Sequence, residues 1–248
     1  VVTVLGRTAA GDWGEPRVAR WDSTSRVTEV SRDEVNSGQG DGGIWVAPTS
    51  DLTGASGAWK FETNQIDIRH YGAAVDGTTD DTISINQAFA AAIDEGVHRV
   101  YFPKGTALVS ASVGGTLAGD IEVEFHPDAL LKGASGMSEP ALELRGSDTV
   151  VTSYNCLVKS PKIDMSDGLY GGGAQTSTCL NAQYYKNCYI FDVDLYGGTT
   201  RSLGNGDSGI TTVANDFTLI QGGTIFGFRD AGIYPGGDNN LTTQGDGK

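Results

Sequence analysis

Short apolar segments recur after residue 98 at a nearly regular spacing, with no second convincing helical period among them. Strands that repeat about every two dozen positions are typical of a solenoid, whose coils bury their inner faces only by stacking on one another. The leucine-rich pattern of the same period is absent, so we expect a parallel β-helix, with an antiparallel sandwich as the alternative. The recurrences are Val100 and Phe102 with Val123 and Phe125, Leu108 with Leu130, Gly197–Thr199 with Gly222–Thr224, and Gly209-Ile210 with Gly232-Ile233.

One amphipathic helix precedes these segments. Its apolar residues recur at spacings of three and four, which places them in a single stripe. Asp80 and Asp81 lie at its start, where a helix N-terminus is partially positive, and Gly96 ends it. The stripe consists of Ile85, Ala88, Phe89, Ala92 and Ile93.

Residues 1–60 differ from the rest because they hold all four tryptophans and no long periodic run. Short strand-like segments alternate with glycine-rich turns, which predicts a small β-module with a tryptophan core, since each such ring buries about 200 Å². We divide the chain into this β-module (1–60), a first strand with its helix (61–104) and β-helix coils (105–248). The tryptophans are Trp13, Trp21, Trp45 and Trp59, and the strand-like segments are 1–5, 18–21, 43–46 and 58–61.

The charge balance excludes two classes of partner. The chain has 17 Lys and Arg against 31 Asp and Glu, a net charge of −14. Nucleic acids and anionic membranes bind concentrated positive charge, so we expect neither as a partner, and no apolar run approaches the roughly 18 residues of a membrane span. Cys156, Cys179 and Cys188 cannot all pair and match no zinc pattern, which predicts buried thiols in a protein made in a reducing cytosol.

The stretch 66–106 resembles a known family. It contains IDIRHYGA (66–73), DGTTDDT (76–82) and VYFPKG (100–105). This order resembles the opening of the pectate-lyase-superfamily (rhamnogalacturonase/epimerase-like) right-handed parallel β-helix, and it implies that the helix caps the N-terminal end of the solenoid. The catalytic motifs of the polygalacturonases in that superfamily are absent, so no catalytic residue carries over.

The module 1–60 resembles the one that precedes such β-helices in bacteriophage tailspike and tail-fibre proteins. The matching motifs are GDWG (11–14), RWDSTS (20–25), DGGI (41–44) and GAW (57–59), with Trp13 and Glu15 where glycine is usual. The resemblance implies a phage-tail virion protein that is made in the host cytoplasm and acts outside the cell. It further implies a homotrimer whose residues 1–60 bind other tail proteins and whose ligand is a bacterial surface glycan.

Candidate catalytic residues come from the strand pattern at 189–195. Alternation predicts that Phe191, Val193 and Leu195 point inward, which leaves Asp192 and Asp194 outward on one face. Their roughly 6.6 Å separation along the strand is close to the carboxyl spacings of glycosidases, about 5.5 Å or about 6.5–9.5 Å. Close carboxyl groups push their pKa values apart, which provides the acid and the base of glycoside cleavage. Acids that only solvate the solenoid surface are the alternative.

Tyrosines in glycine-rich turns are candidate sugar-binding residues, because an exposed ring offers a flat apolar face and a hydroxyl group. Packing against neighbouring coils or subunits is the alternative. The candidates are Tyr170, Tyr184, Tyr185 and Tyr196. We predict no cofactor and no metal site, although eliminative cleavage of acidic sugars would need Ca²⁺ and a basic residue.

The sequence therefore predicts a tailspike or tail-fibre protein that recognises host polysaccharide and cleaves it. A non-catalytic attachment fibre and a secreted pectin-type lyase or hydrolase are the alternatives. The sequence stops at Lys248 without a capping element, so we expect further coils, and with them part of the active groove, beyond that residue.

Overall fold

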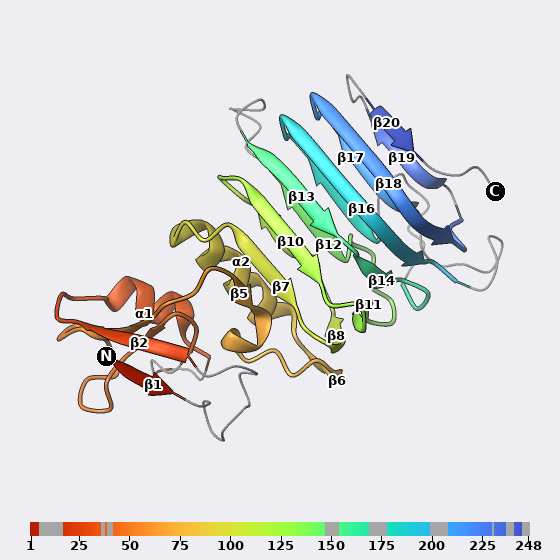
Figure 1. The fold of residues 1–248 in the computed structure, drawn as a ribbon. Coiled ribbons are helices and arrows are strands. Elements are labelled where there is room, and N and C mark those ends of the chain that lie inside the picture. The colour runs from red at the N-terminus through yellow and green to blue at the C-terminus, as the bar shows by residue number, and fades with distance from the viewer. Residues whose placement is uncertain are drawn as a thin grey trace.

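The computed structural model describes residues 1–4, 17–35, 38, 42–146, 154–168, 178–198, 208–229, 231–236 and 241–244. A small module at one end leads into a stack of coils that continues to the other end (Figure 1). The coils form a right-handed parallel β-helix, which confirms the predicted fold class. The described residues after 98 contain strands and no helix, as the sequence predicted.

The N-terminal module is an antiparallel sheet in the order β1-β2-β4-β3, and its strands agree with the predicted segments. One element was not predicted, the helix α1, which buries only Val30 and Asp33. The elements are β1 (Val2–Val4), β2 (Arg17–Asp22), α1 (Val27–Asp33), β3 (Trp45–Val46) and β4 (Ala58–Phe61).

The predicted tryptophan core of this module is only partly right. Trp45 is buried, but Trp21 is 42% exposed and meets Trp59 edge to face, with ring centroids 5.4 Å apart. Other buried positions are taken by Ala19, Ile44, Ala58 and Phe61. Trp13 lies outside the described residues.

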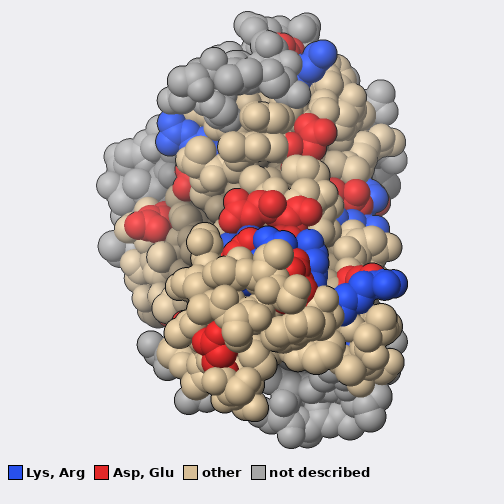
Figure 2. All heavy atoms as spheres, turned by 90° about the vertical axis from the view of Figure 1, so that its left-hand side faces the viewer, with Lys and Arg blue, Asp and Glu red and all other residues tan. Residues whose placement is uncertain are grey.

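One carboxylate joins the module to the cap of the β-helix. Glu95, directly after α2 (Thr82–Asp94), accepts hydrogen bonds from Arg32 Nη2 at 2.9 Å, Trp45 Nε1 at 2.8 Å and Lys60 Nζ at 2.9 Å. Burial alone would raise the pKa of Glu95, but these three donors lower it. Figure 2, seen from the module's side, shows acidic and basic side chains in contact across the middle of this face.

The helix α2 caps the N-terminal end of the solenoid, as the resemblance implied. Gly96, at φ 66°, ends the helix, and its N–H donates to the carbonyl of Ile93. The first strand predicted within 61–104 is short, because β5 (Ile66–Asp67) turns at once into the 3-10 helix η1 (Ile68–Tyr71). The predicted stripe is confirmed: Ile85, Ala88, Phe89 and Ala92 are buried, and Ile93 packs against the same core.

The aspartates of the DGTTDDT motif have structural roles. Asp76 accepts hydrogen bonds from the backbone N–H groups of Thr78 and Thr79, which lower its pKa. Asp81 is buried and accepts from the N–H groups of Ala74 and Val75, while burial raises its pKa. These carboxylates hold the turn before α2 in place, so this part of the motif that carries the resemblance is a folding element.

Each coil contributes strands to three faces. The first and second faces belong to one 11-stranded sheet, and the third face is a 5-stranded sheet. On the first face, β5 is followed by β7 (Arg99–Phe102), β10 (Ile121–Phe125), β13 (Asn155–Lys159), the start of β16 (Asn187–Tyr196), the start of β18 (Phe217–Phe226) and β20 (Leu241–Gln244). The second face has β6 (Asp76–Asp80), β8 (Gly105–Val109), β11 (Ala129–Gly133), β14 (Lys162–Asp164) and the ends of β16 and β18. The third has β9 (Val113–Thr116), β12 (Leu142–Arg145), β15 (Leu180–Gln183), β17 (Ser208–Val213) and β19 (Ala231–Gly236).

The strand register confirms some of the predicted recurrences and corrects others. Val123 pairs with Val100, and Ile233 pairs with Ile210, both as predicted. Leu108 instead pairs with Lys132, and Gly223 pairs with Val193. The reason is that the coils differ in length, so the residues paired on the first face do not recur at a constant interval. The residues paired at one register position of that face are Val100, Val123, Val158, Ile190, Ile220 and Thr243.

The inner columns of the solenoid are apolar and continuous. Phe102 and Phe125 stack in adjacent coils, and Cys156 lies beside Cys188 in the two coils that follow. All three cysteines are buried free thiols, as predicted, and burial contributes to raising the pKa of the Cys179 thiol.

A corner at Asp192 overturns part of the alternation predicted for β16. Asp192 has φ 54°, a left-handed conformation, so the chain turns there from the first face to the second. Val193 and Leu195 are buried as predicted, but Phe191 is half-buried and outward, because the alternation restarts after the corner. Ser160 and Gly222 occupy the same corner in the neighbouring coils, at φ 50° and 80°.

Candidate functional site

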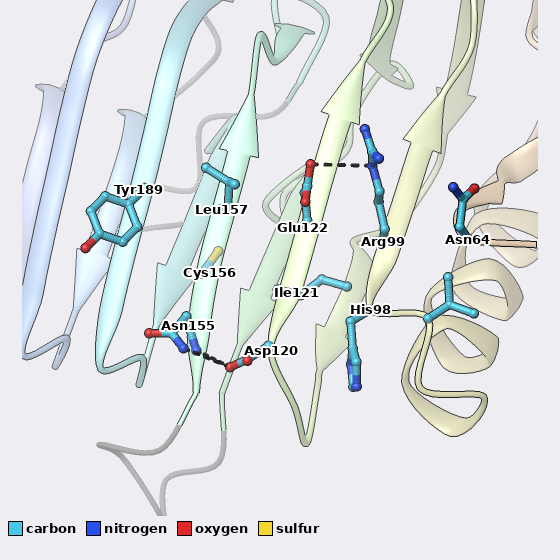
Figure 3. A pocket seen from close by; sticks show the side chains of 11 residues that line it. Asn64, His98, Arg99, Asp120, Ile121, Glu122, Asn155, Cys156, Leu157 and Tyr189 are labelled. Carbon is cyan, nitrogen blue, oxygen red and sulfur yellow. Dashed lines mark hydrogen bonds and ion pairs between the residues drawn. The ribbon is translucent and has the colours of Figure 1, made fainter.

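The outward side of the first face carries a groove of about 510 Å³ that crosses several coils (Figure 3). Outward residues that share a register position stack into columns, because parallel strands align coil upon coil. One column consists of Arg99, Glu122, Leu157, Tyr189 and Leu219. The groove is lined by Asn64, Val97, His98, Arg99, Asp120, Ile121, Glu122, Asn155, Cys156, Leu157 and Tyr189.

Four charged residues, Arg99, Glu122, Glu124 and Lys159, occupy the coils nearest the cap, and we call them the charged quartet. Arg99 pairs with Glu124 and, through Nε at 3.4 Å, with Glu122 Oε1. Lys159 Nζ lies 2.7 Å from the same oxygen of Glu122. The hydrogen bond to Glu124 is the largest cause that raises the pKa of Arg99.

A row of amides borders the quartet where the strands begin. Asp120 accepts hydrogen bonds from the backbone N–H of Asn155 at 2.7 Å and from its side-chain amide at 3.1 Å. Asn187 in the next coil donates to Asn155 Oδ1 at 2.8 Å. Asp120 and Asn155 are exposed, so this row presents polar groups at the rim of the groove.

Half-buried aromatic rings occupy the following two coils. Tyr189 and Phe191 lie nearly parallel, with centroids 6.3 Å apart, and Phe217 approaches Tyr189 at 5.9 Å. Leu157 and Leu219 flank Tyr189 in its column. We call Tyr189, Phe191 and Phe217 the aromatic platform, which adjoins the charged quartet on the same face.

The predicted catalytic aspartates lie beside the groove, around the corner. Both are exposed, Asp192 at the corner itself and Asp194 on the second face, where its Oδ2 is 3.7 Å from Lys162 Nζ. Because of the corner, the two aspartates do not lie on one flat strand, although the sequence predicted that they would. Their catalytic role stays a prediction.

The predicted sugar-binding tyrosines have different surroundings. Tyr185 is completely buried, so its ring cannot stack on a sugar from solvent, and the prediction for this residue is wrong. Tyr184 is half-buried beneath the guanidinium of Arg145, and Tyr196 stacks on Phe226 on the second face. Tyr170 lies outside the described residues.

Sequence reasoning missed Arg99 and Tyr189 as partners in one groove. The signal was present as alternation, because Tyr189 stands between two buried residues of its strand and Arg99 directly precedes the buried Val100. The sequence did not show that the two residues share a column, because the coils between them differ in length.

Metal and membrane sites are not apparent in the described part of the chain. Among those residues no group of three or more His, Cys, Asp or Glu side chains is arranged to hold a metal ion. No helix within the described ranges is long and apolar enough to span a bilayer.

Comparison with known proteins agrees with this fold. Residues 65–242 match the family described as "Rhamnogalacturonase A/epimerase, pectate lyase-like". The uncharacterized protein YclG of Bacillus subtilis (strain 168) is 37% identical over 73 residues, which are 25% of this chain and 12% of YclG.

Solved structures give TM-scores below 0.5. PfbA, a surface adhesin of Streptococcus pneumoniae, has a TM-score of 0.46 and 21% identity, over 64% of this chain and 37% of PfbA. The pre-mature bacteriophage phi29 gene product 12 has a TM-score of 0.44 and 23% identity, over 62% of this chain and 24% of that one. The chain thus spans only a part of the length of each of these proteins. Because the family match covers more than half of its residues, this chain belongs to the rhamnogalacturonase A/epimerase, pectate-lyase-like family.

Proposed function

We propose that this chain is the β-helix part of a tailspike-type protein that binds a bacterial surface polysaccharide in the groove of the first face and cleaves it. Family membership and the tailspike-like motifs of the module 1–60 support the class of protein. The homotrimer and the binding of residues 1–60 to other tail proteins belong to the same proposal.

The observation that carries the proposal is that Tyr189 of the aromatic platform and Arg99 and Glu122 of the charged quartet line one groove. Sugar rings have apolar C–H faces that stack on aromatic rings, and hydroxyl groups that hydrogen-bond to carboxylates and amides. Tyr189 offers the stacking surface, while Glu122 and Asn155 offer acceptors and donors within the same groove. This combination suits a polysaccharide better than a nucleic acid, since the chain is acidic.

Cleavage is assigned to Asp192 and Asp194, which are exposed next to the platform. One carboxyl group would protonate the leaving oxygen and the other would act as base or nucleophile. Lys162 Nζ lies 3.7 Å from Asp194 Oδ2 and orients that carboxylate, which suits the second role.

The test is to incubate the full chain with purified bacterial surface polysaccharides, to measure binding by calorimetry and to analyse products by mass spectrometry. We expect binding that Tyr189→Ala weakens about tenfold, and products that have gained water. Tyr234→Ala, on the third face, is the matched control because its ring is 36% exposed. Binding without products would favour the attachment fibre, products that have lost water would favour a lyase, and no binding to any polysaccharide would overturn the proposal.

A further inference from the structure

We infer that the groove selects uncharged sugars and rejects sugars that carry carboxylate or sulfate groups. This inference rests on the proposed function and names the substrate class of the same groove. The partners of the two cations of the charged quartet carry it.

Both cations of the quartet are already occupied by carboxylates. Arg99 lies between Glu122 and Glu124 and contacts both, so its guanidinium is used on two sides. Lys159 reaches Glu122 from the next coil at 2.7 Å. An anionic sugar would have to displace a carboxylate that is fixed on a strand, with no gain in the number of ion pairs.

The remaining charge of the described groove is negative. Asp120 adds a third carboxylate against the two cations, and its partners are the neutral N–H groups of Asn155. An incoming carboxylate therefore meets a small excess of like charge, within a chain whose net charge is −14.

The other half of the groove is apolar and suits a neutral ring. Leu157 and Tyr189, which line the groove, and the adjacent Phe191 are half-buried, and among the described residues no charged group follows Glu122 in the column of Tyr189. Placing a carboxylate on this surface would remove water from it, and the neighbouring Lys159 is already paired with Glu122, so the cost of desolvation is not compensated. A neutral pyranose loses little hydration free energy there, because its C–H face needs no hydrogen-bond or ionic partner.

The test removes the carboxylate partners of Arg99 and Lys159 and measures whether the preference for uncharged polymers changes to a preference for anionic ones. Glu122→Gln with Glu124→Gln keeps the side-chain shapes but leaves Arg99 and Lys159 without compensating charge. The probes are polygalacturonate and alginate as anionic polymers, and dextran, galactomannan and a neutral bacterial capsule polymer as uncharged ones. We expect the native chain to bind at least one uncharged polymer at least tenfold more tightly than either anionic polymer, and the double variant to gain at least tenfold for the anionic ones at low salt, with the gain lost at high salt.

The matched control is Glu29→Gln with Glu62→Gln, which removes the same charge in the N-terminal module and takes one carboxylate partner each from Arg26 and Arg20, while Arg26 keeps Asp22. Circular dichroism checks whether the double variant folds. If it does not, Glu124→Gln alone is used in its place, and we expect it to give a smaller gain in affinity for the anionic polymers. Native binding of polygalacturonate as tight as that of the uncharged polymers, or an equal gain in the control, overturns the inference and leaves the proposed function intact. Failure of every polymer to bind native chain and variants overturns the proposed function itself.

Discussion

Phe102 and Phe125 stack inside the solenoid, with ring centroids 4.3 Å apart and planes 1° from parallel. The pair spans the first two full coils and is almost completely buried. We predict that Phe125→Ala lowers the free energy of unfolding by about 3–5 kcal/mol, because it leaves a cavity against Phe102. Urea unfolding followed by circular dichroism measures this, with Ile83→Ala on the 75% exposed site as a near-neutral control. A loss below about 1 kcal/mol for Phe125→Ala would contradict the continuous inner stack.

His70 makes stability depend on pH. Burial, and then the neighbouring Arg17 and Arg69, lower the pKa of His70 to about 2, whereas the unfolded chain has a pKa of about 6.5. As the pH falls below about 6.5, the unfolded chain gains a proton that the folded chain does not, so stability falls by up to about 1.4 kcal/mol per pH unit.

The measurement is the free energy of unfolding in urea at several pH values from 7 to 4.5. In His70→Gln the slope should be smaller than in the native chain, by the amount that corresponds to the uptake of nearly one proton on unfolding. Equal slopes in the two proteins would show that His70 becomes protonated in the folded state.

Glu95 fixes the module to the cap through Arg32, Trp45 and Lys60. We predict that Glu95→Ala weakens this docking by about 2–4 kcal/mol, since a nearly buried Arg32 loses a charged partner. Hydrogen exchange should become faster at the amides of β3 and β4 while those of β10 are unchanged. Asp94→Ala is the control, because Asp94 is 60% exposed and contacts Arg32 at only 3.3 Å. Uniform acceleration in both regions would contradict a local joint.

Asp192→Asn and Asp194→Asn test the proposed cleavage. Each should reduce turnover of a bound polysaccharide by about 10²–10⁴, the usual contribution of an acid or base, while its affinity changes little. Product release is followed by mass spectrometry, with Asp128→Asn, at the corner of an earlier coil, as the control. Full turnover in both variants would exclude these carboxylates from the chemistry.

Gly223 marks a close approach of two coils. A Cβ atom there would lie 1.9 Å from the carbonyl oxygen of Val193, whereas one at Gly115 would have no neighbour within 4 Å. Both glycines have positive φ, so Gly115→Ala measures the backbone cost alone, about 1–2 kcal/mol. Gly223→Ala should cost at least about 2 kcal/mol more by thermal unfolding, because the coils must move apart. Equal losses would mean that the coils adjust without strain.

The sequence was sufficient for the parts of the fold that depend on local pattern. The α2 stripe and the Val100–Val123 recurrence were predictable, since periodicity alone determines which side is buried. The helix α1 was missed because Val27, Thr28 and Val30 are β-branched and favour strands when taken alone.

The site was less predictable because it depends on register across coils of different length. Glu122 and Leu157 are neighbours although they lie far apart in the sequence, and only pairing in three dimensions aligns them. Asp192 adopts positive φ without being glycine, so nothing in the sequence indicated that alternation restarts there.

The single-residue corner at Ser160, Asp192 and Gly222 has a consequence for how such chains diversify. The turn from the first face to the second is the same in these three coils, although the coils differ in length. The additional residues therefore fall between β12 and β13, β14 and β15, or β16 and β17. Connecting segments of different length can therefore be accommodated between these strands, while the strands that shape the groove keep their alignment.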